Sequence, residues 1–284
     1  MTTRRIVAGV TALLALALPL SAAAAPLRVA SLNVCTDQLV LALAAPGQIA
    51  ALSRFAGDPR LSASAGKATG FATTRGTAEE VFTLKPDLVV TGSFSLHNTT
   101  DLLRQLGFAV EEFGFDSNIA AVPTAIRRMG KLLGREDEAE AQATAFEDAV
   151  QRLAAPPCAA PPLAIIYEQN GVTLGAGTLA DSALRLAGFR NLAAEQGIEG
   201  MGPLPLEVLV KAQPDLVIFS GYREDAPALA DQTTRHPAFA SLHAEIRRDV
   251  LPPAALSCGS ASALAALAAL RHLHDTLSRC GAAP

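Results

Sequence analysis

The stretch that decides the fold is Glu79-Glu80-Val81-Phe82-Thr83-Leu84-Lys85-Pro86-Asp87-Leu88-Val89-Val90, because the chain contains it twice. Its second copy reads Glu207-Val208-Leu209-Val210-Lys211-Ala212-Gln213-Pro214-Asp215-Leu216-Val217-Ile218. The glutamate favours the positive end of a short helix, and the proline ends that helix. The apolar run after each aspartate is typical of a strand buried in a parallel sheet. Each copy therefore predicts a helix followed by a buried strand.

The residues around the two copies continue the same alternation of strands and helices. We expect strands at 28–32, 108–113, 163–167 and 249–251, and helices that open at Asp37 and Asp181 and run to Leu43 and Leu186. A strand–helix order repeated in this way predicts an α/β fold. The sequence thus predicts two similar Rossmann-like lobes with a ligand cleft between them.

The segment between the lobes has no strand signal. Residues 119–133 read as a helix that stops at Gly134, and residues 135–153 read as a second helix with apolar residues at helical spacing. We expect a single long helix to make the one connection between the lobes. The expected divisions are an N-terminal lobe over 26–118, linking helices over 119–157 and a C-terminal lobe over 158–284.

The N-terminus has the pattern of an export signal. Arg4 and Arg5 precede an apolar stretch over 6–20, and residues 21–25 are small. This order predicts a signal peptide over 1–25 that is cleaved on export to the periplasm. No cysteine stands directly after the cleavage site, so no lipid anchor is expected, and no later segment is long and apolar enough to insert into a membrane.

Composition narrows the classes of function. The hydrophobic share is 50%, the charged share is 18% and the net charge is −4. These values are those of a chain with a packed core and exclude a disordered one. A mildly acidic chain without a basic tract is a poor candidate for binding nucleic acid or an anionic membrane.

Ligands of open α/β sheets bind beyond the carboxyl ends of the strands, so the loops there supply the candidate contacts. Arginines in these loops suit an anionic ligand, and aromatic rings supply apolar surface. The candidates are Asn33, Cys35, Arg54, Phe55, Arg75, Ser93, Phe94 and His97 in the first lobe, and Gln169, Tyr222, Arg223 and Cys258 in the second. Histidines and carboxylates do not converge there, so we predict neither a metal site nor a cofactor.

The four cysteines are even in number and meet an oxidising compartment after export, which favours disulfides. Cys158 precedes the first strand of the second lobe and Cys280 ends the last helix, so both lie away from the cleft. Cys35 and Cys258 each follow a strand and lie at the cleft, one per lobe. We expect Cys158–Cys280 and Cys35–Cys258 bonds. Two free cleft thiols that present soft ligands to a metal centre are the alternative.

The duplicated Lys-Pro-Asp block, the Ser31-Leu32-Asn33 start and the long linking helix resemble the periplasmic binding proteins for iron chelates and cobalamin. The resemblance covers residues 27 to about 280. It implies a monomer, not an enzyme, that captures a ferric siderophore, haem or a corrinoid. It also implies delivery to the permease and ATPase of an inner-membrane ABC importer. Acidic residues that dock on permease arginines in the family map to Glu79 and Glu207.

Two other functions use the same residues. An exported enzyme would use Cys35 or Cys258 as its nucleophile, with His97 as the base, because a thiolate nucleophile needs a base nearby. A sensory or adhesive protein would keep the bilobed fold and bind without transport. Neighbouring genes for a permease and an ATPase would separate transport from both.

Overall fold

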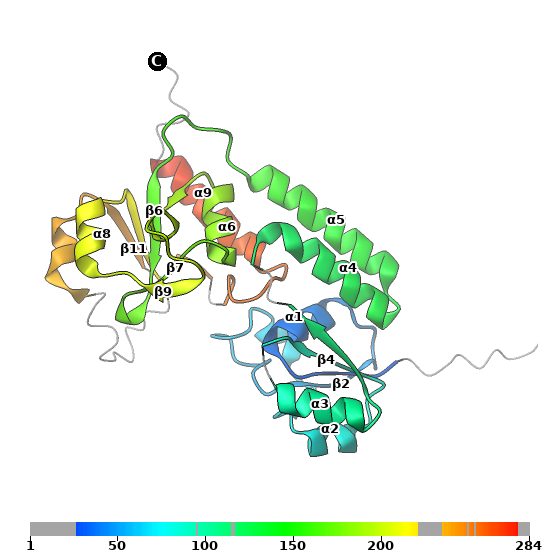
Figure 1. Cartoon of the computed structure of the whole chain (residues 1–284). Coiled ribbons are helices and arrows are strands. Elements are labelled where there is room, and N and C mark those ends of the chain that lie inside the picture. The colour runs from blue at the N-terminus through cyan, green and yellow to red at the C-terminus, as the bar shows by residue number, and fades with distance from the viewer. Residues whose placement is uncertain are drawn as a thin grey trace, which may run out of the picture.

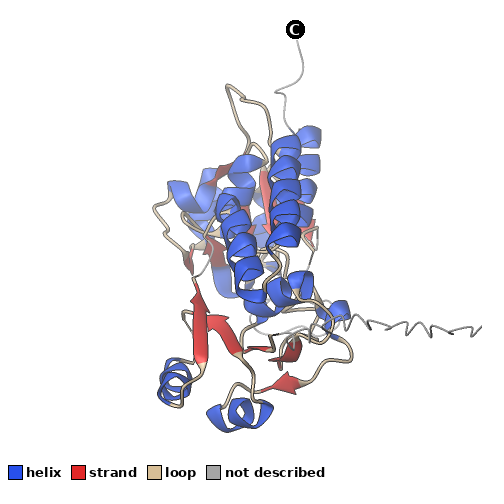
Figure 2. Cartoon of the chain, turned by 90° about the vertical axis from the view of Figure 1, so that its right-hand side faces the viewer, coloured by secondary structure: helices blue, strands red, loops and turns tan. Residues whose placement is uncertain are grey.

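The computed structural model describes residues 27–94, 96–114, 117–220, 235–248, 250–252 and 254–277. Figure 1 shows two α/β lobes, with the helices α4 and α5 lying across one side of the molecule. Figure 2 shows the same arrangement from the side, with long helices grouped next to the sheets. The predicted class, α/β with two lobes, is confirmed.

The N-terminal lobe is built on a five-stranded sheet in the order β3-β2-β1-β4-β5. All its pairs are parallel. The strands are β1 (Val29–Ser31), β2 (Ile49–Ser53), β3 (Thr73–Thr74), β4 (Leu88–Gly92) and β5 (Ala109–Phe113), and the helices are α1 (Val34–Leu43), α2 (Ala78–Leu84) and α3 (His97–Gln105), with a 3-10 turn η1 at Ala65–Ala68. Because the side chain of Asn33 caps α1, that helix begins three residues before the predicted start at Asp37.

The C-terminal lobe has a mixed sheet in the order β11-β10-β6-β7-β9, with β8 beside β6. Strands β10, β11 and β8 run parallel to β6, whereas β7 pairs antiparallel with β6 and β9 pairs antiparallel with β7. The strands are β6 (Leu163–Tyr167), β7 (Val172–Leu174), β8 (Arg190–Asn191), β9 (Met201–Pro203), β10 (Leu216–Phe219) and β11 (Glu245–Arg248). The helices are α6 (Leu179–Leu186), α7 (Leu192–Glu195), α8 (Leu206–Ala212) and α9 (Ala263–Leu277), with 3-10 turns η3 (Gln169–Gly171) and η6 (Pro237–Ser241).

The closing strand of this lobe corrects one prediction. The sequence places it at 249–251, but β11 covers Glu245–Arg248. Three of its four residues are charged, as is common for an edge strand, so it lacks the apolar run that marks a buried strand. The guanidinium of Arg248 instead lies over the ring of Phe219, 4.2 Å from the centroid.

The repeated Pro-Asp pair has the same structural role in both lobes. Oδ2 of Asp87 accepts a hydrogen bond of 2.7 Å from the backbone N–H of Arg28, and Oδ2 of Asp215 accepts one of 2.7 Å from that of Leu163. The backbone N–H of each aspartate donates back to the carbonyl of the same residue, at 2.8 Å in both lobes. Each aspartate therefore holds the first strand of its lobe beside the repeated strand.

The link between the lobes contains the two helices that the sequence predicts at 119–133 and 135–153. After a 3-10 turn η2 (Ile119–Ala121) come two packed helices, α4 (Val122–Leu133) and α5 (Glu136–Leu153), joined by a turn at Gly134. Helix α4 packs on α1 of the first lobe, and α5 packs on α9 of the second. The 18 residues of α5 reach about 27 Å and lead the chain into β6.

One apolar cluster runs through both lobes and the link. It contains Leu52 and Val90 from the first sheet, Met129 and Phe146 from α4 and α5, and Ile166 and Leu267 from the second lobe. Interiors are packed densely and yield little to small displacements. The shared cluster therefore couples the lobes through the helix pair and favours small movements between them.

Candidate ligand-binding site

A pocket of about 180 Å³ lies where the two lobes meet, at the carboxyl ends of β1, β4 and β5. The start of α1 forms one wall, with Asn33, Cys35, Thr36 and Leu39. The residues after β4 and at the end of β5 form a second wall, with Ser93, Phe94 and Phe113. Cys258 and Gly259 reach the pocket from the loop before α9. Residues from both lobes therefore line the same pocket.

The wall at α1 is held in place by its own hydrogen bonds. Oδ1 of Asn33 accepts from the backbone N–H of Cys35 at 2.8 Å, and the hydroxyl of Thr36 donates to the carbonyl of Asn33 at 2.9 Å. The hydroxyls of Ser31 and Thr36 are 2.8 Å apart. The positive end of the α1 dipole therefore lies at the pocket, where it favours an anionic group.

Asp37 lies one step further along α1 and is fully buried. Its carboxylate accepts hydrogen bonds from the backbone N–H of Ser53 at 3.0 Å and from the Ser53 hydroxyl at 2.5 Å. Burial outweighs these hydrogen bonds and raises the pKa of Asp37 to about 6. The first turn of α1 thus carries a carboxyl group that titrates just below neutral pH.

The second wall is aromatic. Phe94 is 80% exposed at the pocket, whereas Phe113 is buried, with the guanidinium of Arg128 stacked 4.4 Å from its ring centroid. Arg128 is held by an ion pair of 2.6 Å with Glu111 and by the carbonyl of Glu112. One side of the pocket is therefore a rigid ring and the other a ring that is free to receive an apolar surface.

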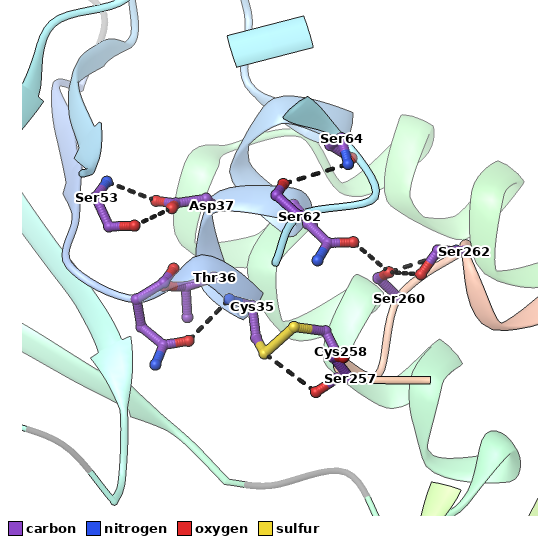
Figure 3. The surroundings of a disulfide bond; sticks show 12 residues. Cys35, Thr36, Asp37, Ser53, Ser62, Ser64, Ser257, Cys258, Ser260 and Ser262 are labelled. Atoms are coloured by element: carbon purple, nitrogen blue, oxygen red, sulfur yellow. Dashed lines mark hydrogen bonds between the residues drawn. A yellow bond between two sulfur atoms is a disulfide. The ribbon is translucent and has the colours of Figure 1, made fainter. Parts of the chain in front are cut away.

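A disulfide crosses the pocket from lobe to lobe. Cys35 and Cys258 are bonded, with their Cα atoms 5.1 Å apart, which confirms the predicted pairing (Figure 3). The hydroxyl of Ser260 also donates to Oε1 of Gln38 at 2.8 Å, between the same two segments. Cys158 takes part in a disulfide too, and its predicted partner Cys280 lies outside the described residues.

The other residues of the first lobe that we predict to contact ligand do not line the pocket formed by the described residues. Arg54 stacks over Phe55 at 4.6 Å, and both side chains are exposed. Arg75 pairs with Glu80, with Nε and Oε1 2.7 Å apart, and hydrogen bonds from Thr74 and Arg75 lower the pKa of Glu80 to about 2. His97 is the exposed first residue of α3.

The second lobe contributes less to the described pocket than the sequence predicts. Gln169 is half-buried and opens η3 directly after β6, at the carboxyl end of that strand. Tyr222 and Arg223 lie outside the described residues. Sequence reasoning missed Leu39 and Phe113 among the pocket residues, because in sequence they read as ordinary core positions of a helix and a strand. In the described part of the chain, no three His, Cys, Asp or Glu side chains gather as a metal site.

Glu79 and Glu207 occupy equivalent places on the two lobes. Each lies in the first turn of its helix, α2 or α8, and each is exposed. Figure 1 shows these helices on the outer flanks of their lobes, away from the pair α4 and α5. Both carboxylates are therefore accessible to a second molecule.

The family model for periplasmic binding proteins matches residues 29–251, which is most of the chain. The chain belongs to the periplasmic binding protein family. A curated relative, the cobalamin-binding protein of Halobacterium salinarum, is 29% identical over 211 residues. That match covers 72% of this chain and 57% of the relative, so the chain spans little more than half the length of the relative it matches.

Solved structures share the fold of this periplasmic binding protein. The periplasmic heme-binding protein RhuT from Roseiflexus sp. RS-1 has a TM-score of 0.70 at 21% identity, over 88% of this chain and all of that one. The periplasmic vitamin B12 binding protein BtuF of Vibrio cholerae has a TM-score of 0.68 at 17% identity, over 89% of this chain and 98% of that one. At such identities the likeness shows the fold alone. Among the helices described here, none has the length and apolar character needed to cross a bilayer.

Proposed function

We propose that this periplasmic binding protein captures a metal chelate between its lobes and delivers it to an inner-membrane ABC importer. The observation that carries the proposal is the pocket itself, which opens at the carboxyl ends of parallel strands and takes residues from both lobes. The family and the ligands named for its relatives, cobalamin and heme, support a chelate rather than a free ion.

The chemistry of the pocket narrows the ligand. A volume of about 180 Å³ is below the usual size of a small-molecule site, so it accepts one edge of a large ligand. Phe94, Phe113 and Leu39 offer apolar contact, and the amino end of α1 favours negative charge. A ligand with an apolar ring system and anionic groups fits best, and haem, a corrinoid and an anionic ferric siderophore all belong to this class.

Delivery uses the outer faces of the lobes. Glu79 and Glu207 sit at the starts of α2 and α8 and match the positions of the acidic residues that dock on permease arginines in the resembled family. We place the permease across these two helices, with its ATPase behind it. Residues 1–25 direct export to the periplasm, where an oxidising environment supports the Cys35–Cys258 bond.

The bonded cysteines argue against the enzymatic alternative. A cysteine nucleophile acts as a free thiolate near a base. Cys35 and Cys258 are bonded to each other, and the ring of His97 is exposed outside the pocket. Binding without covalent chemistry is the function that this arrangement supports.

Titration of the mature protein tests the proposal. Hemin, cyanocobalamin and a ferric hydroxamate siderophore are added in turn, and binding is followed by absorbance and calorimetry. One of the three should bind at 1:1 stoichiometry, and Phe94→Ala should weaken its binding about fivefold or more, since an aromatic contact is worth about 1 kcal/mol beyond its buried area. The control Phe82→Ala removes another exposed ring, on α2, and should leave affinity unchanged. Failure of all three probes to bind would overturn the proposal.

A further inference from the structure

Two contacts join α1 to the loop before α9, and they lie next to each other beside the pocket. The first is the Cys35–Cys258 disulfide, and both of its residues line the pocket. The second is the buried hydrogen bond of 2.8 Å from Ser260 to Gln38. Figure 3 shows the disulfide and Ser260 on this loop opposite the start of α1. We call these four residues the interlobe seam.

The seam fixes orientation as well as distance. Cys35 and Gln38 are three positions apart on α1, so their side chains share one face of the helix. Cys258 and Ser260 meet that face from the other lobe. Attachment at two points resists rotation of the loop about the helix, whereas the disulfide alone leaves such rotation open.

The hydrogen bond between Ser260 and Gln38 is stable only while the two segments of the seam remain in contact. Gln38 is 3% exposed and Ser260 is 5% exposed. Nε2 of Gln38 is buried and has no hydrogen-bond partner among the described residues. Buried amides normally satisfy their hydrogen bonds, because an unpaired polar group loses its hydration without compensation. A covalent bond one turn away offsets this cost and keeps the amide in place.

We propose that the interlobe seam positions the two walls of the ligand pocket, so that ligand affinity depends on the oxidation state of Cys35 and Cys258. This inference rests on the proposed function of the pocket. Closure joins two thiols in one S–S bond, while a protein disulfide oxidant takes up the two electrons and two protons and becomes a dithiol. An added dithiol reverses the reaction and is itself oxidised to a disulfide. The reduced protein keeps its fold, because the apolar cluster through α4 and α5 still joins the lobes.

The chain supplies its own control. Cys158 is also disulfide-bonded, but it lies ahead of β6, at the end of the strand opposite to the cleft. The double variant Cys158→Ser/Cys280→Ser removes a pair of cysteines from the same chain without touching the seam. A general effect of lost cross-links would appear in both double variants, whereas a positioning effect would appear only in Cys35→Ser/Cys258→Ser.

The test combines ligand titration with amide hydrogen exchange on the full mature protein. Hemin, cyanocobalamin and a ferric hydroxamate siderophore serve as the probes. Cys35→Ser/Cys258→Ser should bind the active probe at least tenfold more weakly, and exchange should rise at 34–39 and 254–262. The Cys158→Ser/Cys280→Ser control should stay within twofold of wild type. Ser260→Ala should weaken binding more in the seam variant than in the disulfide-bonded protein, because the hydrogen bond then holds the loop alone.

The outcomes separate the seam from the proposed function. If the wild type binds none of the probes, the proposed function fails, and the exchange measurement still decides whether the seam orders both walls. Equal affinity and equal exchange in wild type and Cys35→Ser/Cys258→Ser would overturn the seam. Weaker binding with exchange raised evenly over the whole chain would overturn it as well, because the disulfide would then act on global stability.

Discussion

The two lobes share a frame but differ in the segment that comes after their first strand. In both lobes a Pro-Asp aspartate holds that strand beside the repeated one. After β1 the chain enters α1 and returns in parallel as β2, whereas after β6 it turns within η3 and returns antiparallel as β7. Helix α1, which forms a wall of the pocket, therefore corresponds to the tight turn η3 in the second lobe. The frame is duplicated, and the α1 wall of the pocket lies where the two copies diverge.

The largest expected effect tests whether the two repeated helices, α2 and α8, dock together on the permease. Reversing both Glu79 and Glu207 to Lys places like charges against the proposed permease arginines, which costs several kcal/mol. Uptake of the bound probe chelate by whole cells should fall more than tenfold, while affinity of the isolated protein stays unchanged.

The control for this prediction is Glu136→Lys, which makes one such charge reversal at the exposed start of α5, away from both docking helices. It should transport normally. Normal uptake by the double variant would remove the docking role, and lost ligand affinity would place the glutamates in the binding site instead.

The second-largest expected effect is a loss of stability when the tight turn η3 after β6 is altered. Gly171 has φ +75°, and a Cβ there would lie 2.9 Å from the buried Tyr167 hydroxyl, which donates to the carbonyl of Leu204. Gly171→Ala combines backbone strain with this clash and should lower the free energy of unfolding by about 3 kcal/mol in urea denaturation.

Gly177 provides the matched control, since its φ is +73° but a Cβ there meets nothing within 4 Å. Gly177→Ala should cost only the backbone strain, about 1 kcal/mol. Equal losses in the two variants would mean that the packing around Tyr167 does not constrain the turn.

Asp37 gives a comparable effect in the other lobe, and it depends on pH. Its pKa is about 6 in the folded protein against an ordinary value of 3.8, so the folded state binds more proton between these values. Stability should therefore fall as pH rises from 4 to 6, by at most about 3 kcal/mol. Asp37→Asn should lack this decline when urea unfolding is compared at pH 4 and pH 7. A decline equal to that of wild type would assign the effect to another group.

Much of the fold is predictable because its signals are local in sequence. The Pro-Asp blocks and the apolar runs each span a few residues, and their duplication gives two lobes. The sequence also favours the Cys35–Cys258 pairing, since it places both residues at the cleft after strands, but it leaves two free cleft thiols as the alternative. Helix α1 starts early because Asn33 caps it, a signal that a search for acidic residues passes over.

The rest depends on contacts between distant segments. Phe113 reads as one more strand residue, and only the fold brings it to the pocket beside Leu39. The hydrogen bond between Gln38 and Ser260 joins residues 222 positions apart, with no local pattern at either end. Strand β11 is held at the sheet edge by backbone hydrogen bonds to β10, and its side chains are mostly charged. It therefore lacks the apolar run by which a buried strand is recognised in sequence.

The smallest expected effect tests the shared frame itself. Asp87→Ala removes the acceptor for the backbone N–H of Arg28, and Asp215→Ala removes that for Leu163, at the same distance of 2.7 Å. Both bonds are exposed, so water replaces the lost acceptor and each variant should lose only about 1 kcal/mol of unfolding free energy. Asp101→Ala is the control, because its exposed ion pair with Arg104 at 3.3 Å adds little to stability.

Since the Asp87 and Asp215 hydrogen bonds have the same geometry, the two losses of unfolding free energy should agree within about 0.5 kcal/mol, a precision that thermal and urea unfolding together provide. A difference above about 1 kcal/mol would mean that the lobes have diverged in their frame as well as in their first crossover. The excess would then fall on Asp87, because the Arg28 side chain also donates to the carbonyl of Leu84 and couples the Asp87 hydrogen bond to α2.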